Sequence, residues 1–261
     1  MKSNPYRAKA EAGQVQFGTW LNLVRNPAVL TLLKSAGLDF ARVDMEHSAY
    51  SFETVADMAV MSRALDFPIA VRPPDGERGT ITRLLDSGIW NLHVPQVDTP
   101  EQAYAVAQAA RYAPDGQRGM SALGPHLDFE VVSQAERVKH QNSQIHITVM
   151  LESKQAFEKL DEIASVEGVN ALTLGPSDLA QDLGVLGTPS QSKVLREHRV
   201  RLAEAARNHG KAVAMAVDTI EAVREVIALG ATIVNYSSDT NVLRSTYAAA
   251  VAEIRTPKER S

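Results

Sequence analysis

The feature of this sequence that most constrains its fold is a regular alternation of short β-type runs and longer runs of helical period. Eight runs rich in apolar and β-branched residues recur along the chain, at residues 15–21, 39–45, 69–73, 91–97, 145–151, 171–175, 212–217 and 232–238. Helical periodicity follows each of them, or lies between them, at residues 27–37, 51–65, 78–88, 99–113, 154–166, 190–210, 219–230 and 240–255. Gly37, Gly88, Gly210 and Gly230 end four of these helical runs, as expected where a helix turns back into a strand.

Strands that alternate with helices in this way favour a closed parallel barrel, the α/β (β/α)8 TIM barrel, over an open sheet. A doubly wound sheet is the alternative, but no Gly-x-Gly-x-x-Gly turn follows the first strand. The 261 residues suit one such barrel, so we expect a single domain over residues 1–261. The long segment 98–144, between the fourth and fifth strands, is typical of a lid or a subunit contact.

Composition excludes several functional classes. A net charge of -4 and a pI near 6.0 provide no general attraction for nucleic acid or for an anionic membrane. The absence of cysteine excludes thiol catalysis, disulfides and thiolate metal sites. The N-terminus is polar and lacks the apolar segment of a signal peptide, and no apolar run approaches the ~20 residues of a transmembrane helix. We therefore expect a cytoplasmic protein that binds neither nucleic acid nor membrane.

Ionisable residues follow several predicted strands, at the end of a barrel where active sites form. They are Asp44, Glu46 and His47 after the second strand, Arg72 at the end of the third, Glu152 after the fifth and Asp178 after the sixth. Glu152 and Asp178 come from adjacent strands, and two carboxylates at one barrel mouth suit Mg²⁺ or Mn²⁺, with Co²⁺ as a further candidate. Solvated loop acids, or a helix N-cap at Asp178, explain the two carboxylates equally well.

The remaining candidates concern substrate binding and proton transfer. Arg72 suits a small carboxylate or phosphate, and a salt bridge at the rim explains it equally well. The turn from Gly175 through Pro176 and Ser177 offers backbone N–H groups at a helix start, and it is also a plain turn. His47 is the natural general base, and Asp86 in "RLLDSG" is a candidate to orient it, although it also fits a simple helix-terminal acid.

Other side chains are assigned to packing, and lysine is absent where one mechanism would need it. His93 lies inside a predicted strand and is interpreted as a satisfied core histidine, while Trp20 and Trp90 are interpreted as packing residues. A Schiff-base aldolase needs a lysine that projects into the barrel, and none of the eight strand runs contains one. The sequence therefore argues against imine chemistry and favours a metal as the electrophile.

Five motifs occur in a specific order along the chain: "DMEHS" after the second strand, "VRPP" after the third, "LLDSG" in the next helix, "LES" after the fifth strand and "LGPSDL" after the sixth. Together they resemble the HpcH/HpaI family of metal-dependent (class II) pyruvate aldolases, which belongs to the phosphoenolpyruvate/pyruvate barrel superfamily. The resemblance runs from about residue 18 to about residue 234, and "GTW" near the N-terminus and "QRG" in the long connection also fit.

The resemblance implies a role for each matched position. Glu152 and Asp178 would bind a divalent cation, Arg72 would hold the pyruvate carboxylate and stabilise the enolate oxygen, and His47, paired with Asp86, would exchange a proton through a water. The substrate would be a 4-hydroxy-2-oxo acid, cleaved reversibly to pyruvate and an aldehyde. The assembly implied is a homo-oligomer, a hexamer built as a trimer of dimers with exchanged C-terminal helices and active sites near subunit boundaries.

Two departures from the family pattern concern the substrate. Met150 stands two residues before Glu152, where family members often have a glutamine that touches the pyruvate unit, and the segment after "QRG" has no second arginine. Both positions leave the aldehyde partner open. Two alternative functions also remain: a related lyase or decarboxylase acting on a CoA thioester or another 2-oxo acid, and a metabolite-binding barrel without catalysis.

Overall fold

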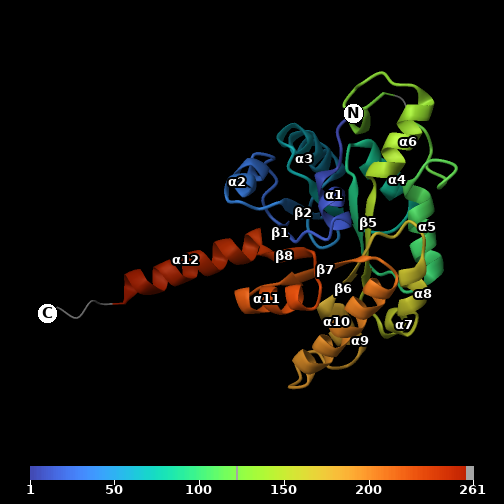
Figure 1. The fold of residues 1–261 in the computed structure, drawn as a ribbon. Coiled ribbons are helices and arrows are strands. Elements are labelled where there is room, and N and C mark those ends of the chain that lie inside the picture. The colour runs from blue at the N-terminus through green and yellow to red at the C-terminus, as the bar shows by residue number, and fades with distance from the viewer. Residues whose placement is uncertain (122, 257–261) are drawn as a thin grey trace.

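The computed structural model describes residues 1–121 and 123–256, and its centre is a closed barrel of eight parallel strands (Figure 1). Each strand pairs with the next along the chain, and β1 pairs with β8 to close the barrel. The strands are β1 (Gln16–Leu21), β2 (Phe40–Asp44), β3 (Ile69–Arg72), β4 (Asn91–Val94), β5 (His146–Leu151), β6 (Ala171–Leu174), β7 (Ala212–Val217) and β8 (Ile233–Ser238). The predicted (β/α)8 barrel is confirmed, because every predicted run forms a strand with ends displaced by three residues or fewer.

Helices surround this barrel, and all the predicted helical runs contain one (Figure 1). They are α2 (Val29–Ser35), α3 (Phe52–Leu65), α4 (Arg78–Asp86), α5 (Pro100–Ala110), α7 (Lys154–Glu158), α8 (Leu160–Ser165), α10 (Gln191–Asn208), α11 (Ile220–Ala228) and α12 (Asp239–Arg255). The run 154–166 forms two helices because Lys159 between them leaves helical geometry, with φ -108° and ψ 19°. No described helix combines the length and the apolar character needed to cross a membrane.

Three further helices and one short turn of 3-10 helix lie outside the predicted runs. They are α1 (Pro5–Glu11), α6 (Gln134–Gln144), α9 (Pro176–Asp182) and the 3-10 turn η1 (Pro125–Leu127). A capping box formed by Ser133 and Glu136 begins α6, so a Ser-x-x-Glu pattern in the sequence did mark this helix. The helix itself is polar, however, and gives little apolar periodicity.

The strands divide their side chains between an apolar outer layer and a polar interior. Successive residues of a strand face opposite sides, so Val43 and Val71 pack against the helices in the large apolar cluster. The buried polar side chains carried by the strands are Gln16, Thr19, Arg42, Asp44, Asn91, His93, His146, Thr148, Thr173, Asn235 and Ser238. The contacts between strands and outer helices therefore supply most of the hydrophobic stabilisation. The barrel interior contains charged and hydrogen-bonding groups together with a smaller apolar cluster of Tyr6, Phe40, Ala70, Ala171, Ala214 and Ile233.

Helix α1 covers the amino-terminal end of the barrel. Tyr6 is buried there, and its ring meets the rings of Phe40 and His146 edge to face, each at 5.0 Å between centroids. Such aromatic pairs contribute about 0.5–1.5 kcal/mol beyond the area they bury. Asn4 caps the helix and donates a hydrogen bond to Asn91 of β4, which ties α1 to the barrel wall. The carboxyl-terminal end of the barrel is left as the open end.

Candidate active site

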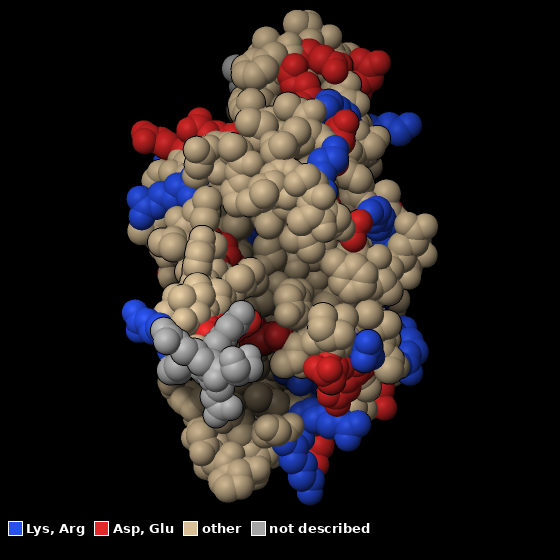
Figure 2. Space-filling view, turned by 90° about the vertical axis from the view of Figure 1, so that its left-hand side faces the viewer, with Lys and Arg blue, Asp and Glu red and all other residues tan. Residues whose placement is uncertain are grey.

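A pocket of about 350 Å³ opens among the carboxyl ends of the strands. Figure 2 looks onto the face toward which α12 extends, and acidic side chains lie in a hollow near the middle of that face. The predicted site residues that line the pocket are His47, Arg72, Met150, Glu152, Gly175, Pro176, Ser177 and Asp178. Of the predicted set, Asp86 lies elsewhere.

Glu152 and Asp178 are the two acidic side chains that line this pocket. Glu152 follows β5, is 6% exposed, and accepts a hydrogen bond through Oε1 from the backbone N–H of Gln96 at 2.7 Å. Burial is the main cause that raises the pKa of Glu152 to about 7; the charges of Asp178 and Glu46 act in the same direction, and the hydrogen bond from Gln96 opposes them. A divalent cation would relieve this desolvation and repulsion, so the donor set fits one.

Asp178 lies in the first turn of α9, but it does not cap that helix. The N-cap residue is Gly175, and α9 has no side-chain cap hydrogen bond, so the capping explanation of Asp178 is wrong. Within the described ranges, no group of three or more His, Asp or Glu side chains is arranged to hold a metal. The chain itself therefore offers two carboxylates, and the other coordination positions of a cation would fall to ligand and water oxygens.

Gly175 brings the start of α9 into close contact with Glu152. A Cβ atom added at Gly175 would stand 2.1 Å from Oε2 and 2.7 Å from Cβ of Glu152. Any larger residue would therefore displace the carboxylate. Glycine is required here because two neighbouring strand ends approach one another closely at the two acidic residues.

Arg72 ends β3 and is held in the pocket by two carboxylates. Its Nε and Nη2 donate to the two oxygens of Asp44 at 2.9 and 2.7 Å, and its Nη1 lies 3.1 Å from Oε2 of Glu46. The bidentate pair fixes the plane of the guanidinium group. Arg72 is thus both an ion-pair partner and a pocket residue, and the two sequence interpretations of it apply together.

Asp44 organises the turn that follows β2. Its side chain is completely buried and accepts hydrogen bonds from Nδ2 of Asn22 and from the backbone N–H groups of Glu46 and His47. Burial acts to raise the pKa of Asp44, but the hydrogen bonds and charge of Arg72 outweigh it and lower the pKa. The carboxylate therefore stays ionised and holds both Arg72 and the segment that carries His47.

His47 stands at the rim of the pocket with its side chain 61% exposed. Its Nε2 lies 3.7 Å from Oε2 of Glu46, and the other carboxylate oxygen of Glu46, Oε1, accepts a hydrogen bond from Nε2 of Gln96 at 3.1 Å. An exposed imidazole beside a carboxylate can exchange protons with solvent and with a ligand above the pocket. Glu46 consequently links the predicted base to Arg72 within one subunit.

Asp86 is not brought to His47 within the chain. It is the last residue of α4, shortly before β4 begins, and therefore lies toward the amino-terminal end of the barrel. There its Oδ1 accepts a hydrogen bond from Nη2 of Arg118 at 2.6 Å. The pairing of His47 with Asp86 would need the Asp86 of another subunit.

Two side chains that the sequence places in the core, Trp20 and His93, also line the pocket. Trp20 lines it, with the guanidinium groups of Arg42 and Arg72 at 5.1 and 4.7 Å from its ring. His93 also lines it and is buried, but neither ring nitrogen has a hydrogen-bond partner among the described residues, so its interpretation as a core histidine satisfied by its neighbours is wrong. The signal that would have identified these residues is their inward position, since alternate residues of a barrel strand face the interior.

The lysines lie where the sequence predicts. No described strand contains one, Lys154 begins α7, and Nζ of Lys211 donates to the carbonyls of Val166 and Val169 at the opposite end of the barrel. A Schiff base with a ligand in the pocket therefore has no amine available from the described strands.

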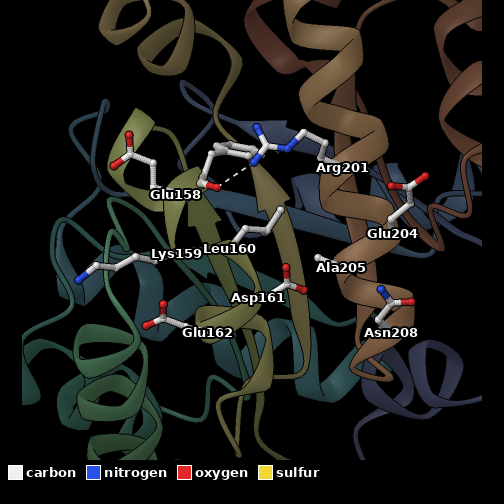
Figure 3. Close-up of a pocket in the computed structure, with 10 residues that line it drawn as sticks. Glu158, Lys159, Leu160, Asp161, Glu162, Arg201, Glu204, Ala205 and Asn208 are labelled. Atoms are coloured by element: carbon white, nitrogen blue, oxygen red, sulfur yellow. Dashed lines mark hydrogen bonds between the residues drawn. The ribbon is translucent and has the colours of Figure 1, made fainter.

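A second pocket, of about 270 Å³, lies outside the barrel between α7, α8 and α10 (Figure 3). Arg201 crosses it and donates a hydrogen bond to the carbonyl of Phe157 at 3.0 Å. Its other polar side chains belong to helices and to Lys159, and no strand end contributes to it. This pocket therefore lacks the convergence of strand-end groups that distinguishes the pocket at the barrel mouth.

Comparison with known proteins gives consistent matches over nearly the whole chain. The family model described as HpcH/HpaI aldolase/citrate lyase matches residues 16–246. A 5-keto-4-deoxy-D-glucarate aldolase of Shigella dysenteriae is 36% identical over 245 residues, covering 93% of each chain. A hydroxypyruvate/pyruvate aldolase of Deinococcus radiodurans is 37% identical over 246 residues, covering 92% of this chain and 86% of that protein.

Solved structures agree with these sequence matches. The crystal structure of an HpcH/HpaI aldolase from Desulfitobacterium hafniense superposes over the full length of both chains with a TM-score of 0.93 and 29% sequence identity. The order of motifs, the barrel and the family match therefore lead to one assignment. The chain belongs to the HpcH/HpaI aldolase/citrate lyase family.

Proposed function

We propose that this aldolase, a carbon–carbon lyase, uses a divalent cation to cleave a 4-hydroxy-2-oxo acid reversibly into pyruvate and an aldehyde. The observation that carries the proposal is the convergence of Glu152, Asp178 and Arg72 in one pocket at the barrel mouth. Two acidic groups and one guanidinium provide sites for a cation and for a small carboxylate in the same place.

Glu152 and Asp178 are the residues that would hold the cation. The pKa of Glu152 is raised, first by burial and then by the neighbouring acids, and this supports the assignment. A site that favours a bound proton on the carboxylate also favours another positive charge beside it, such as a metal cation. When bound, a divalent cation supplies Lewis-acid polarisation of the substrate's 2-oxo group. Mg²⁺ and Mn²⁺ suit two carboxylates equally, and Co²⁺ is a further candidate.

Arg72 would bind the substrate carboxylate and stabilise negative charge that develops as the carbon–carbon bond breaks. Asp44 and Glu46 hold its guanidinium group in place before any ligand arrives. Such preorganised donors contribute more to catalysis than mobile ones, since no reorganisation is needed during the reaction.

His47 would remove the proton from the C4 hydroxyl group during cleavage, and a solvent-derived proton would complete pyruvate. If Asp86 orients His47, it must come from a neighbouring subunit, since the two lie toward opposite ends of one barrel. The exposed helix α12 supports assembly, because it has no buried residue and carries an apolar stripe of Leu243, Tyr247, Val251 and Ile254. We therefore propose a homo-oligomer, specifically a hexamer of three dimers.

The relatives indicate two kinds of substrate for a panel. One relative is named for 5-keto-4-deoxy-D-glucarate, and another for hydroxypyruvate and pyruvate. Met150 lies in the pocket lining and offers no hydrogen bond to the pyruvate unit, so we propose that specificity differs from family members with glutamine there.

Pyruvate release from a panel of 4-hydroxy-2-oxo acids, with Mg²⁺ or Mn²⁺, tests the proposal. EDTA should abolish the activity and added cation should restore it, whereas borohydride with pyruvate should not inactivate the enzyme. Irreversible borohydride trapping would refute the metal mechanism. Silence across the panel, despite binding of cation and pyruvate, would favour a binding protein, and activity on a CoA thioester alone would favour the related lyase.

Subunit mixing tests the roles of His47 and Asp86. The variants His47→Ala and Asp86→Ala should each lose most turnover while retaining pyruvate and cation binding. Mixed oligomers should regain activity, because some sites would combine an intact His47 from one subunit with an intact Asp86 from another. Failure of mixing to restore any activity, with mixed oligomers demonstrated by mass spectrometry, would contradict a shared site.

A further inference from the structure

Arg42 is a buried cation whose charge has no carboxylate partner among the residues that the structure describes. It projects into the barrel from β2, two residues before Asp44, and is completely buried. Its Nη2 lies 3.4 Å from the hydroxyl group of Tyr6, at the long limit of a hydrogen bond, and its Nε has no partner in residues 1–121 and 123–256. Buried cations are normally paired with an anion, because an uncompensated charge in a protein interior is costly.

The neighbouring Arg72 shows what Arg42 lacks. Both guanidinium groups lie against the ring of Trp20, at 5.1 Å for Arg42 and 4.7 Å for Arg72, so the two are neighbours in one pocket. Arg72 has Asp44 and Glu46 as anionic partners, whereas within the described part of the chain Arg42 contacts only aromatic rings and the tyrosine hydroxyl. The indole ring compensates part of a cation's charge, but it offers no acceptor for the N–H groups.

His93 supplies a second unpartnered polar group at the same place. Its ring meets that of Trp20 edge to face at 5.5 Å, it is buried, and neither of its ring nitrogens has a hydrogen-bond partner within the described part of the chain. Both His93 and Arg42 line the pocket that contains Glu152 and Asp178. Unsatisfied donors at the floor of an accessible pocket indicate that a ligand or ordered water supplies the missing acceptors.

We propose that Arg42 and His93 form a carboxylate subsite on the floor of the active-site pocket, which selects a 2-oxo or 2-hydroxy acid carrying a second carboxylate. The inference rests on the proposed function, since the first carboxylate would be held by Arg72 together with a cation at Glu152 and Asp178. A guanidinium group presents parallel donors to a carboxylate, and the imidazole adds another donor. An apolar substituent in the same position would leave both side chains unpartnered, which disfavours it.

Malate and 2-hydroxybutyrate provide a matched pair of probes for isothermal titration calorimetry. Both chelate a cation through the same 2-hydroxy acid group, and they differ in whether a carboxylate or a methyl group ends the chain. We expect the Mg²⁺-loaded protein to bind malate at least about tenfold more tightly than 2-hydroxybutyrate. A ratio of this size corresponds to one hydrogen bond to a charged group. Arg42→Met should bring the affinity ratio close to one, and His93→Leu should lower it in part. Binding of 2-hydroxybutyrate should change by less than about threefold in both variants.

Two controls make the result decisive. Arg83→Met removes one positive charge from the exposed surface of α4 and should keep the wild-type ratio, which excludes a general effect of net charge. Arg42→Lys keeps the charge without the planar fork and should retain a reduced preference for malate, which provides a second variant if Arg42→Met does not fold.

The outcomes separate this inference from the proposed function. A wild-type protein without a preference for malate, or a preference unchanged by Arg42→Met, Arg42→Lys and His93→Leu, would overturn the subsite and assign the floor to water. Failure of pyruvate and of both hydroxy acids to bind with Mg²⁺ would refute the cation site instead. A preference for malate that depends on Arg42 even without Mg²⁺ would uphold the subsite alone.

Discussion

Asp44→Asn is the substitution that tests most directly how the pocket is held together. The buried carboxylate of Asp44 accepts two hydrogen bonds from Arg72, one from Asn22 and two from the backbone N–H groups of Glu46 and His47. Asparagine has the same shape, but it removes the negative charge and places an NH₂ donor where an acceptor stood. Within the described residues Arg72 then keeps one anionic partner, Glu46, at 3.1 Å.

The magnitude follows from the burial of the pair. Removing one partner of a buried ion pair destabilises a protein by about 3–5 kcal/mol, and the remaining contact with Glu46 favours the lower end, about 3 kcal/mol. For a chain of this size, that loss lowers Tm by about 6–12 °C. The pKa of Asp44 is lowered in the folded state, because Arg72 outweighs the effect of burial. Its contribution is therefore fully present at pH 7 and is lost only as pH falls through the folded-state pKa.

Urea unfolding at pH 7, followed by circular dichroism, measures this loss, and calorimetry with Mg²⁺ measures pyruvate binding by the same sample. We expect pyruvate affinity to fall at least about tenfold, since Arg72 loses its bidentate orientation. The control, Asp57→Asn on the exposed surface of α3, should change stability by less than about 0.5 kcal/mol. A loss below about 1 kcal/mol with unchanged pyruvate affinity would refute the reasoning, because Glu46 alone would then hold Arg72.

Three further substitutions test other parts of the structure. Gly175→Ala would place a Cβ 2.1 Å from Oε2 of Glu152, so the affinity for Mg²⁺, measured by calorimetry, should fall at least about tenfold. The control Gly79→Ala, whose added Cβ has no atom within 4 Å, should leave the Mg²⁺ affinity unchanged. Glu152→Gln should stabilise the metal-free protein at pH 8 by roughly 2–3 kcal/mol in urea unfolding. The folded-state pKa of Glu152, near 7, lies above its unfolded value, so the wild type loses stability as pH rises from the unfolded pKa to the folded one. Destabilisation by the substitution would contradict this. Burial, with the charge of Arg118 adding to it, lowers the pKa of His126 to about 4, so between pH 6.5 and about 4 the wild type should lose about 1.4 kcal/mol per pH unit relative to His126→Gln. Parallel stability curves for these two proteins at pH 7, 6 and 5 would show that His126 is not buried in its neutral form.

The barrel and the location of its active site were predictable because both depend on local periodicity. Strands that are buried on two sides appear in the sequence as short apolar runs, and helices with one apolar face show apolar residues that recur with a period of 3.6. Once eight such units are recognised, chain order places the residue after each strand at the barrel mouth. Glu152, Asp178, Arg72 and His47 could therefore be assigned to one pocket without any knowledge of their contacts.

The pairing of side chains was less predictable, because it depends on length and direction rather than on sequence order. The sequence predicts a pairing of His47 with Asp86, but α4 runs away from the mouth and carries Asp86 toward the other end of the barrel. The carboxylate beside His47 is its own neighbour Glu46, and the partner of Arg72 is Asp44. The contact between Arg72 and Asp44 follows from register, since they are aligned residues of adjacent strands.

Some polar residues inside the barrel were not recognised from the sequence as part of the site. In most folds one face of a strand packs and the other meets solvent, so a buried histidine such as His93 is assumed to be satisfied by its neighbours. Here most residues on both faces of the strands are buried, and the apolar contacts of residues such as Val43 with the outer helices supply most of the hydrophobic stabilisation. The inner face is thereby free to carry groups that the chain leaves without partners. In "FARVD", the alternation of Phe40, Arg42 and Asp44 already marks an inward face that changes from apolar to charged toward the mouth. An unpaired cation at such a position indicates ligand binding more strongly than a charge on the rim, because water can satisfy the rim charge and cannot freely reach the interior one.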